Sequence, residues 1–104
     1  MTRSVSIFGA TGSVGLSTLD LVRQHRDAYR VVVLTANGNA SALAKLAIEF
    51  GAELAVVADE AAYPALKDAL QGTGIEAAAG AQALVEAAQR DVDWTMASIV
   101  GCAG

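Results

Sequence analysis

Residues 8–15 read Phe8-Gly9-Ala10-Thr11-Gly12-Ser13-Val14-Gly15, a glycine-rich string that directly follows a short run of strand-forming residues. From the end of the string onward, residues recur at helical spacing: Val14, Thr18, Leu21 and Val22. A glycine-rich turn between a strand and a helix is typical of phosphate-binding loops in parallel α/β sheets. The string therefore predicts a strand, a tight turn and a helix in that order.

Each glycine of this string has an expected role. Gly9 permits the tight turn, Gly12 lets the main chain approach a pyrophosphate, and Gly15 allows the helix to pack closely on the strand. The spacing is G-x-x-G-x-x-G, which is one residue longer in its first gap than the fingerprint typical of NAD sites. This longer form is common to several NADP-linked families, so it does not name an enzyme.

The start of the predicted helix is a candidate anion site. We expect the amides of Gly12, Ser13 and Val14 to point outward, because the first amides of a helix lack partners within it. The helix dipole favours an anion there, and the hydroxyl groups of Thr11 and Ser13 can add hydrogen bonds. A diphosphate fits this description. The alternative is a glycine-rich turn that serves only to reverse the chain.

The rest of the chain repeats the strand–helix unit, which predicts an α/β fold with a parallel sheet. We expect strands near Val5–Phe8, Val31–Thr35, Leu54–Ala58, Ile75–Ala78 and Trp94–Val100. The fold class is a Rossmann-type doubly wound parallel sheet with helices on both faces. Right-handed crossovers would place the first and fourth strands side by side, where the strand order reverses and a ligand crevice opens.

Helix boundaries follow from capping residues and turn signals. Ser41 is placed to cap the second helix. The third begins near Asp59, carries Pro64 in its early turns, and ends at the turn Gly72–Gly74. The fourth runs from about Ala81 to Gln89.

The end of the second strand bears on the choice between NADP and NAD. NAD-selective sites usually hold a carboxylate there, which binds the ribose hydroxyls and repels a 2′-phosphate. No Asp or Glu occurs between Asp27 and Glu49, and the turn reads Asn37-Gly38-Asn39. The Asn amides can donate to a 2′-phosphate and Gly38 exposes backbone, so the sequence favours NADP. An ordinary Asn-Gly turn with a helix cap is the alternative.

Length and composition exclude several classes of protein. At 104 residues, with 54% hydrophobic and 17% charged residues, the chain suits one folded domain. Its formal net charge of −4 opposes nucleic-acid binding. Met1–Phe8 lacks the pattern of a signal peptide, and no apolar run is long enough to span a membrane, so we expect a soluble, cytoplasmic protein.

The remaining reactive side chains are interpreted as structural. His25 lies near the end of the first helix, and Cys102 is the only cysteine, so neither a disulfide nor a closed metal site is expected. Ser6 and Ser98 lack the surroundings of a nucleophile. Three large side chains are expected to pack in the core: Tyr29, Trp94 and Met96.

Several strings together resemble the 1-deoxy-D-xylulose 5-phosphate reductoisomerase family over the whole chain. They are FGATGSVG with STLDLV, then VVVLTANGN, GAELAVVADE, AAAGAQALVEAA and finally DWTMASIVGCAG. The last string is similar to the strand and turn beside the nicotinamide in that family, and it is more specific than the glycine motif. Family members often carry Lys or Arg where this chain has Gly38.

The resemblance implies an NADPH-binding domain of an enzyme that isomerises and reduces 1-deoxy-D-xylulose 5-phosphate to 2-C-methyl-D-erythritol 4-phosphate in non-mevalonate isoprenoid biosynthesis. It also implies a divalent metal, Mg or Mn, and a homodimer at full length. The cofactor contacts that the resemblance implies are Thr11, Gly12, Ser13, Val14, Asn37, Gly38 and Asn39, and the glycine motif itself adds Gly9 and Gly15 to the predicted site. Catalytic residues, metal ligands and the C-terminal domain would lie beyond residue 104, so we expect the chain alone to be inactive.

Two other hypotheses are compatible with the leading motif. One is another NADP-linked dehydrogenase, of the aspartate-semialdehyde dehydrogenase type. The other is a non-catalytic module that senses the state of NADP and passes it to a protein partner.

Overall fold

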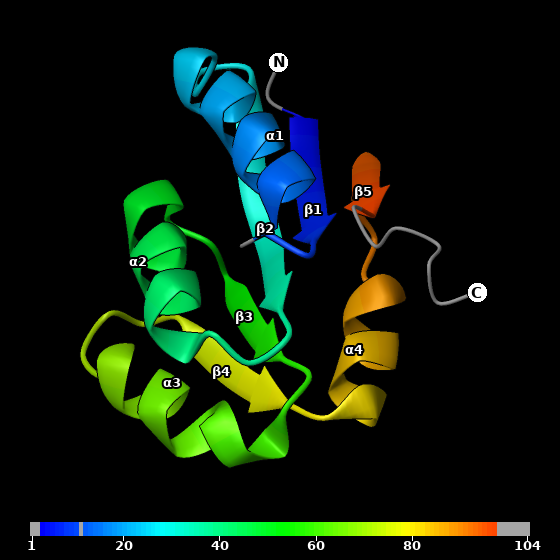
Figure 1. Ribbon diagram of the computed structural model, residues 1–104. Helices are drawn as coiled ribbons and strands as arrows, with labels where there is room; N and C mark the ends of the chain where they lie inside the picture. The colour runs from blue at the N-terminus through cyan, green and yellow to red at the C-terminus, as the bar shows by residue number, and fades with distance from the viewer. Residues whose placement is uncertain (1–2, 11, 98–104) are drawn as a thin grey trace.

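The computed structural model describes residues 3–10 and 12–97, and within them the chain alternates strands and helices (Figure 1). The strands are β1 (Arg3–Phe8), β2 (Tyr29–Ala36), β3 (Leu54–Val57), β4 (Glu76–Ala79) and β5 (Trp94–Ala97). The helices are α1 (Ser13–Gln24), α2 (Ala40–Phe50), α3 (Tyr63–Ala69) and α4 (Ala81–Ala88), with a short 3-10 turn, η1 (Glu60–Ala62), before α3.

The five strands form one parallel sheet in the order β4-β3-β2-β1-β5. Helices α1, α2 and α3 cover one face and α4 covers the other (Figure 1). One apolar cluster joins the first three helices to the sheet, and a second joins α4 to the opposite face. Strands buried on both faces read as continuous apolar runs, as Val31–Leu34 does. The predicted fold class is confirmed.

The predicted order of the strands is wrong at one position. We expected the fourth strand beside the first, but β4 lies at the edge of the sheet next to β3, and β5 pairs with β1. The three crossovers through α1, α2 and α3 continue in one direction, and the reversal comes at α4. The half-exposed alanines of β4, Ala77–Ala79, suit an edge strand.

The helix caps largely follow the sequence, with one correction. The α2 cap is Asn39, whose Oδ1 accepts a hydrogen bond from the Ala42 amide at 3.2 Å, and Ser41 lies inside the helix. Both residue types are good caps, so their order alone did not separate them. Asp59 caps η1, and Pro64 stands at the start of α3, as expected.

Two of the three large side chains assigned to the core pack against it. Tyr29 and Met96 are partly buried on the main cluster, whereas Trp94 is 37% exposed, so its assignment to the core is wrong. Trp94 begins strand β5, which pairs only with β1 among the described strands. Its ring lies 6.1 Å from that of Tyr29.

Some expectations fall on residues that the structure does not describe. These are the continuation of the last strand to Val100, and the residues Thr11, Ser98 and Cys102. Among the helices that are described, none combines the length and apolar character needed to cross a membrane.

Candidate functional site

The turn between β1 and α1 is shaped by two glycines that no other residue can replace without strain. Gly9 has a φ of 82°, in the left-handed region that favours glycine. A methyl group added to Gly15 would lie 2.2 Å from the carbonyl oxygen of Gly9 and 2.8 Å from Cα of Ala10. The first turn of α1 therefore packs directly against the backbone that leaves β1, as the sequence predicted for Gly15.

Thr35 fixes this turn to the neighbouring strand β2. The Gly9 amide donates to Oγ1 of Thr35 at 3.0 Å, and the Ala10 amide donates to the Thr35 carbonyl at 2.7 Å. Thr35 is only 4% exposed, and its hydrogen bond with the Gly9 amide is part-buried. The bonds hold the turn at the carboxyl end of β1, beside the carboxyl end of β2. Sequence reasoning did not assign this role to Thr35.

The amides at the start of α1 are only partly available to a ligand. The Gly12 amide donates to the Gly9 carbonyl at 3.1 Å, so its predicted outward direction is wrong. The first helical bond runs from Leu16 to the Gly12 carbonyl, so the amides of Ser13, Val14 and Gly15 have no acceptor inside the helix. This end of α1 carries the positive end of the helix dipole. The hydroxyl groups of Thr11 and Ser13 lie outside what the structure describes.

The second predicted turn, Asn37 to Asn39, is exposed and lies between β2 and α2. Asn39 uses its side-chain oxygen as the helix cap, which leaves its NH₂ group as a donor. The Asn37 carbonyl accepts a hydrogen bond from the amide of Asp59 at 2.8 Å. This turn is therefore connected to the end of β3.

Asp59 is a charged neighbour of this turn that the sequence did not reveal. A methyl group added to Gly38 would lie 3.6 Å from both Cβ and Oδ2 of Asp59. The pairing of Ala36 with Val57 brings the two segments together, since the residues that follow each strand then run side by side. Although the stretch from 28 to 48 holds no carboxylate, one reaches Gly38 from the next strand.

The two turns lie together at the carboxyl end of the sheet, where β1 and β2 both end (Figure 1). Of the nine predicted cofactor residues, all except Thr11 are described. Five lie in the two turns, and three form the start of α1: Gly9, Gly12, Asn37, Gly38 and Asn39, then Ser13, Val14 and Gly15. In open parallel sheets, ligands bind beyond the carboxyl ends of the strands where the strand order reverses. Here the reversal lies at β1, between β2 and β5.

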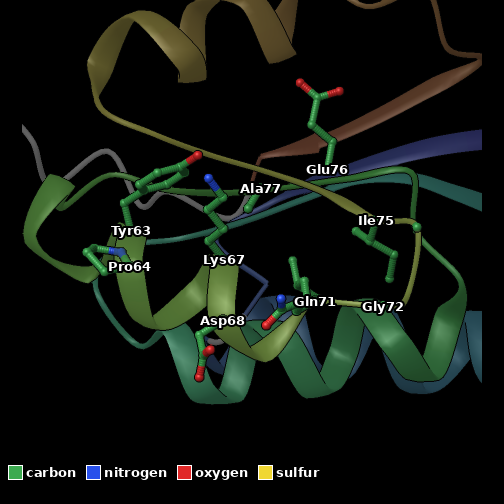
Figure 2. Close-up of a pocket in the computed structure, with 11 residues that line it drawn as sticks. Tyr63, Pro64, Lys67, Asp68, Gln71, Gly72, Ile75, Glu76 and Ala77 are labelled. Carbon is green, nitrogen blue, oxygen red and sulfur yellow. The ribbon is translucent and has the colours of Figure 1, made fainter.

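A separate groove of about 770 Å³ lies along α3 and the open edge of β4. Figure 2 shows Lys67 extending from α3 toward Ala77, with the ring of Tyr63 beside it, and the Lys67 ammonium lies 5.9 Å from the centre of that ring. None of the predicted cofactor residues lines this groove. The groove is therefore distinct from the carboxyl end of the sheet, where the two turns lie.

Ionisable groups with a shifted pKa lie between α1 and α2. A hydrogen bond from the Arg23 guanidinium to Glu49 lowers the pKa of the Glu49 carboxyl and raises the pKa of Arg23.

Within the described residues, no group of three or more His, Cys, Asp or Glu side chains could hold a metal ion.

Fold and site together define the class of protein: a Rossmann-type α/β domain with a glycine-rich turn at the reversal of its sheet. A family model, described as 1-deoxy-D-xylulose 5-phosphate reductoisomerase, matches residues 5–104. The chain belongs to this family. This result decides against the aspartate-semialdehyde dehydrogenase type.

Relatives and solved structures agree with the family model. The chain is 56% identical over 102 residues to the reductoisomerase of Zymomonas mobilis and 58% identical to that of Rhodospirillum centenum; each match covers 98% of this chain. These matches span 26% and 25% of the relatives, so the chain has about a quarter of their length. The structure of the Z. mobilis enzyme in complex with NADPH matches with a TM-score of 0.95 at 55% identity, covering 100% of this chain and 28% of that one.

A second solved structure extends the comparison to a more distant member. A reductoisomerase in complex with magnesium matches with a TM-score of 0.88 at 36% identity, covering 100% of this chain and 26% of that one. The arrangement of strands and helices is therefore retained at well below half identity.

Proposed function

We propose that residues 1–104 are the NADPH-binding domain of a 1-deoxy-D-xylulose 5-phosphate reductoisomerase. The full-length enzyme would isomerise and reduce 1-deoxy-D-xylulose 5-phosphate to 2-C-methyl-D-erythritol 4-phosphate, a step of non-mevalonate isoprenoid biosynthesis. NADPH supplies the hydride for the reduction. Family membership and the NADPH complex of the Z. mobilis relative support this proposal.

One observation supports the binding role most directly: the amides of Ser13, Val14 and Gly15 have no acceptor within α1. Close packing at Gly15 and the two bonds to Thr35 hold these donors in place before a ligand arrives. A pyrophosphate at this position would accept the free donors and gain from the helix dipole. Gly9 and Gly12 shape the turn and keep side chains away from the phosphates.

The second turn would hold the adenosine ribose and its 2′-phosphate. The NH₂ groups of Asn37 and Asn39 and the exposed backbone at Gly38 are hydrogen-bond donors for a phosphate. The start of α2 adds a favourable dipole. These donors are neutral, so the preference for NADPH over NADH should be moderate.

Further points of the proposal concern the whole protein. A divalent metal, Mg or Mn, belongs to it by family, and relatives have been solved with magnesium. A structure of a reductoisomerase also contains fosmidomycin with NADPH and magnesium, and we propose a sugar-phosphate substrate here. We assign no catalytic residue and no metal ligand to this chain. We propose that the full-length enzyme is a cytoplasmic homodimer.

Binding of NADPH and NADH to the purified chain tests the proposal. Isothermal titration calorimetry and the fluorescence of the reduced nicotinamide should both report tighter binding of NADPH. Trp94 is the less useful probe, because it lies at the amino end of β5, away from the carboxyl ends of the strands. Equal affinities would contradict the NADP assignment, and no binding of either nucleotide would contradict the proposed function.

A further inference from the structure

Asp59 lies where the end of β3 meets the proposed 2′-phosphate turn. Two backbone bonds join the segments: the Ala58 amide donates to the Ala36 carbonyl at 2.9 Å, and the Asp59 amide donates to the Asn37 carbonyl at 2.8 Å. These bonds fix the Asp59 backbone beside the turn. The position of its carboxylate is thus set by the pairing of β2 with β3.

The two carboxylate oxygens of Asp59 have different surroundings. Oδ1 accepts a hydrogen bond from the Ala61 amide at 3.0 Å and caps η1. Oδ2 faces Gly38, where it would lie 3.6 Å from an added methyl group. Within residues 3–10 and 12–97, no Lys or Arg forms an ion pair with Asp59. Its charge is therefore not neutralised by an ion pair with any described Lys or Arg.

We propose that Asp59 is a specificity-determining residue that lowers the preference of this site for NADPH over NADH. The inference rests on the function proposed above. NAD sites usually hold a carboxylate at the end of the second strand, where it accepts hydrogen bonds from the ribose hydroxyls. Here the third strand supplies a carboxylate to the same turn.

The two nucleotides differ only at the ribose 2′ position, so this carboxylate acts on them in opposite directions. A 2′-phosphate beside Oδ2 adds like charges at short distance, which weakens NADPH binding. A 2′-hydroxyl can instead donate a hydrogen bond to the same oxygen, which helps NADH. The Asn donors and the α2 dipole favour the phosphate, and Asp59 partly offsets them.

The test compares NADPH and NADH binding to the chain and to the variant Asp59→Asn. Asparagine is nearly isosteric and is an equally good cap, so η1 should keep its start. The control is Asp68→Asn, which removes the same charge from the exposed outer part of α3. Circular dichroism checks that all three proteins are folded, and calorimetry gives both dissociation constants at low and physiological ionic strength.

For Asp59→Asn we expect the ratio of NADPH to NADH affinity to rise about 10-fold at low salt, a change typical of removing one nearby like charge. The increase should be smaller at physiological ionic strength, because salt screens exposed charges. Asp68→Asn should leave the ratio unchanged. An unchanged ratio in Asp59→Asn, or an equal rise in Asp68→Asn, would overturn the role of Asp59 while leaving NADPH binding intact. If the unaltered chain binds neither nucleotide, the proposed function fails and this inference fails with it.

Discussion

The two turns of the candidate site are built in opposite ways. The β1–α1 turn is sterically closed: Gly9 has a positive φ, and Gly15 leaves no room for a methyl group. The β2–α2 turn is open, since Gly38 has ordinary backbone angles and space for a side chain. Bonds to the buried Thr35 fix the first turn, whereas the second is exposed.

This difference separates two functions that a dinucleotide site must combine. In the proposed dinucleotide site, the closed turn would present backbone amides to the pyrophosphate, which NADPH and NADH share. The open turn would present side chains to the ribose, where the two nucleotides differ, so we expect substitutions there to change selectivity without affecting the fold. We therefore expect substitutions in the closed turn to alter stability, and substitutions in the open turn to alter the ratio of cofactor affinities.

The largest effect should come from Gly15→Ala. The new methyl group would overlap the Gly9 carbonyl and Cα of Ala10, both of which are backbone atoms that cannot rotate away. Helix α1 must then move off β1, and we expect the free energy of unfolding to fall by at least about 3 kcal/mol. Urea unfolding followed by circular dichroism measures this. A loss below about 1 kcal/mol would show that the turn can relax.

Gly12→Ala is the matched control in the same turn. A methyl group there would lie 3.5 Å from the Gly9 carbonyl, an ordinary contact, and φ is −80°. The cost in stability should stay below about 1 kcal/mol, the effect of a poorer helix cap. NADPH should nevertheless bind at least about 10-fold more weakly, because the methyl group occupies the approach of the phosphates. Unchanged affinity would argue against a pyrophosphate at this turn.

Thr35→Val should have the next largest effect. Valine keeps the branched shape of threonine but removes Oγ1, which accepts the part-buried hydrogen bond from the Gly9 amide. Loss of this hydrogen bond should lower the free energy of unfolding by about 0.5–1.5 kcal/mol, which thermal and urea unfolding can detect.

Thr95→Val on strand β5 is the control for this variant, since its side chain is exposed and makes no hydrogen bond to another described residue. It should change stability by less than about 0.5 kcal/mol. If the two variants lose equal stability, the bond between Gly9 and Thr35 does not hold the turn.

The closed turn could be predicted from sequence because its cause is local. Gly9 and Gly15 are six positions apart, and a strand followed by a helix brings them together in any Rossmann-type unit. The bond to Thr35 was missed because it depends on the register between two strands. The inward bond of Gly12 was missed for a related reason: the motif gives glycine spacing but not the direction of each amide.

Features that depend on distant pairing were predicted less well. The contact between Gly38 and Asp59 requires the register of β2 with β3, for which the sequence carries no direct signal. The position of β4 was wrong because crossover handedness limits each connection but does not say after which strand the order reverses. Ser41 and Asn39 are both good caps, and only the observed helix start selects Asn39.

The open turn should accept Gly38→Lys without loss of stability. The backbone there is ordinary, and the space beside Asp59 admits a side chain. An added ammonium group near the 2′-phosphate should raise the affinity for NADPH relative to NADH about 10-fold. Gly38→Gln is the uncharged control of similar length and should leave the ratio nearly unchanged. A marked loss of stability in either variant would mean that the turn is not open.

The smallest effect should come from the ion pair that joins α1 to α2, away from both turns. The pKa of Glu49 is lowered in the folded chain by its hydrogen bond to Arg23, so this group stabilises the fold above the pKa of an unfolded Glu, about 4.3. The stabilisation is lost as the pH falls through the lowered pKa of the folded state.

Because both side chains are well exposed, Glu49→Gln should lower the midpoint of thermal unfolding by less than about 3 °C at pH 7. The difference from the unaltered chain should shrink as the pH falls below the pKa of an unfolded Glu and Glu49 becomes protonated. Glu86→Gln, whose carboxylate has no described partner, should show no such difference at pH 7. A larger change in Glu49→Gln, or an effect on the cofactor ratio, would mean that the contact between α1 and α2 helps to position the turns that precede these helices.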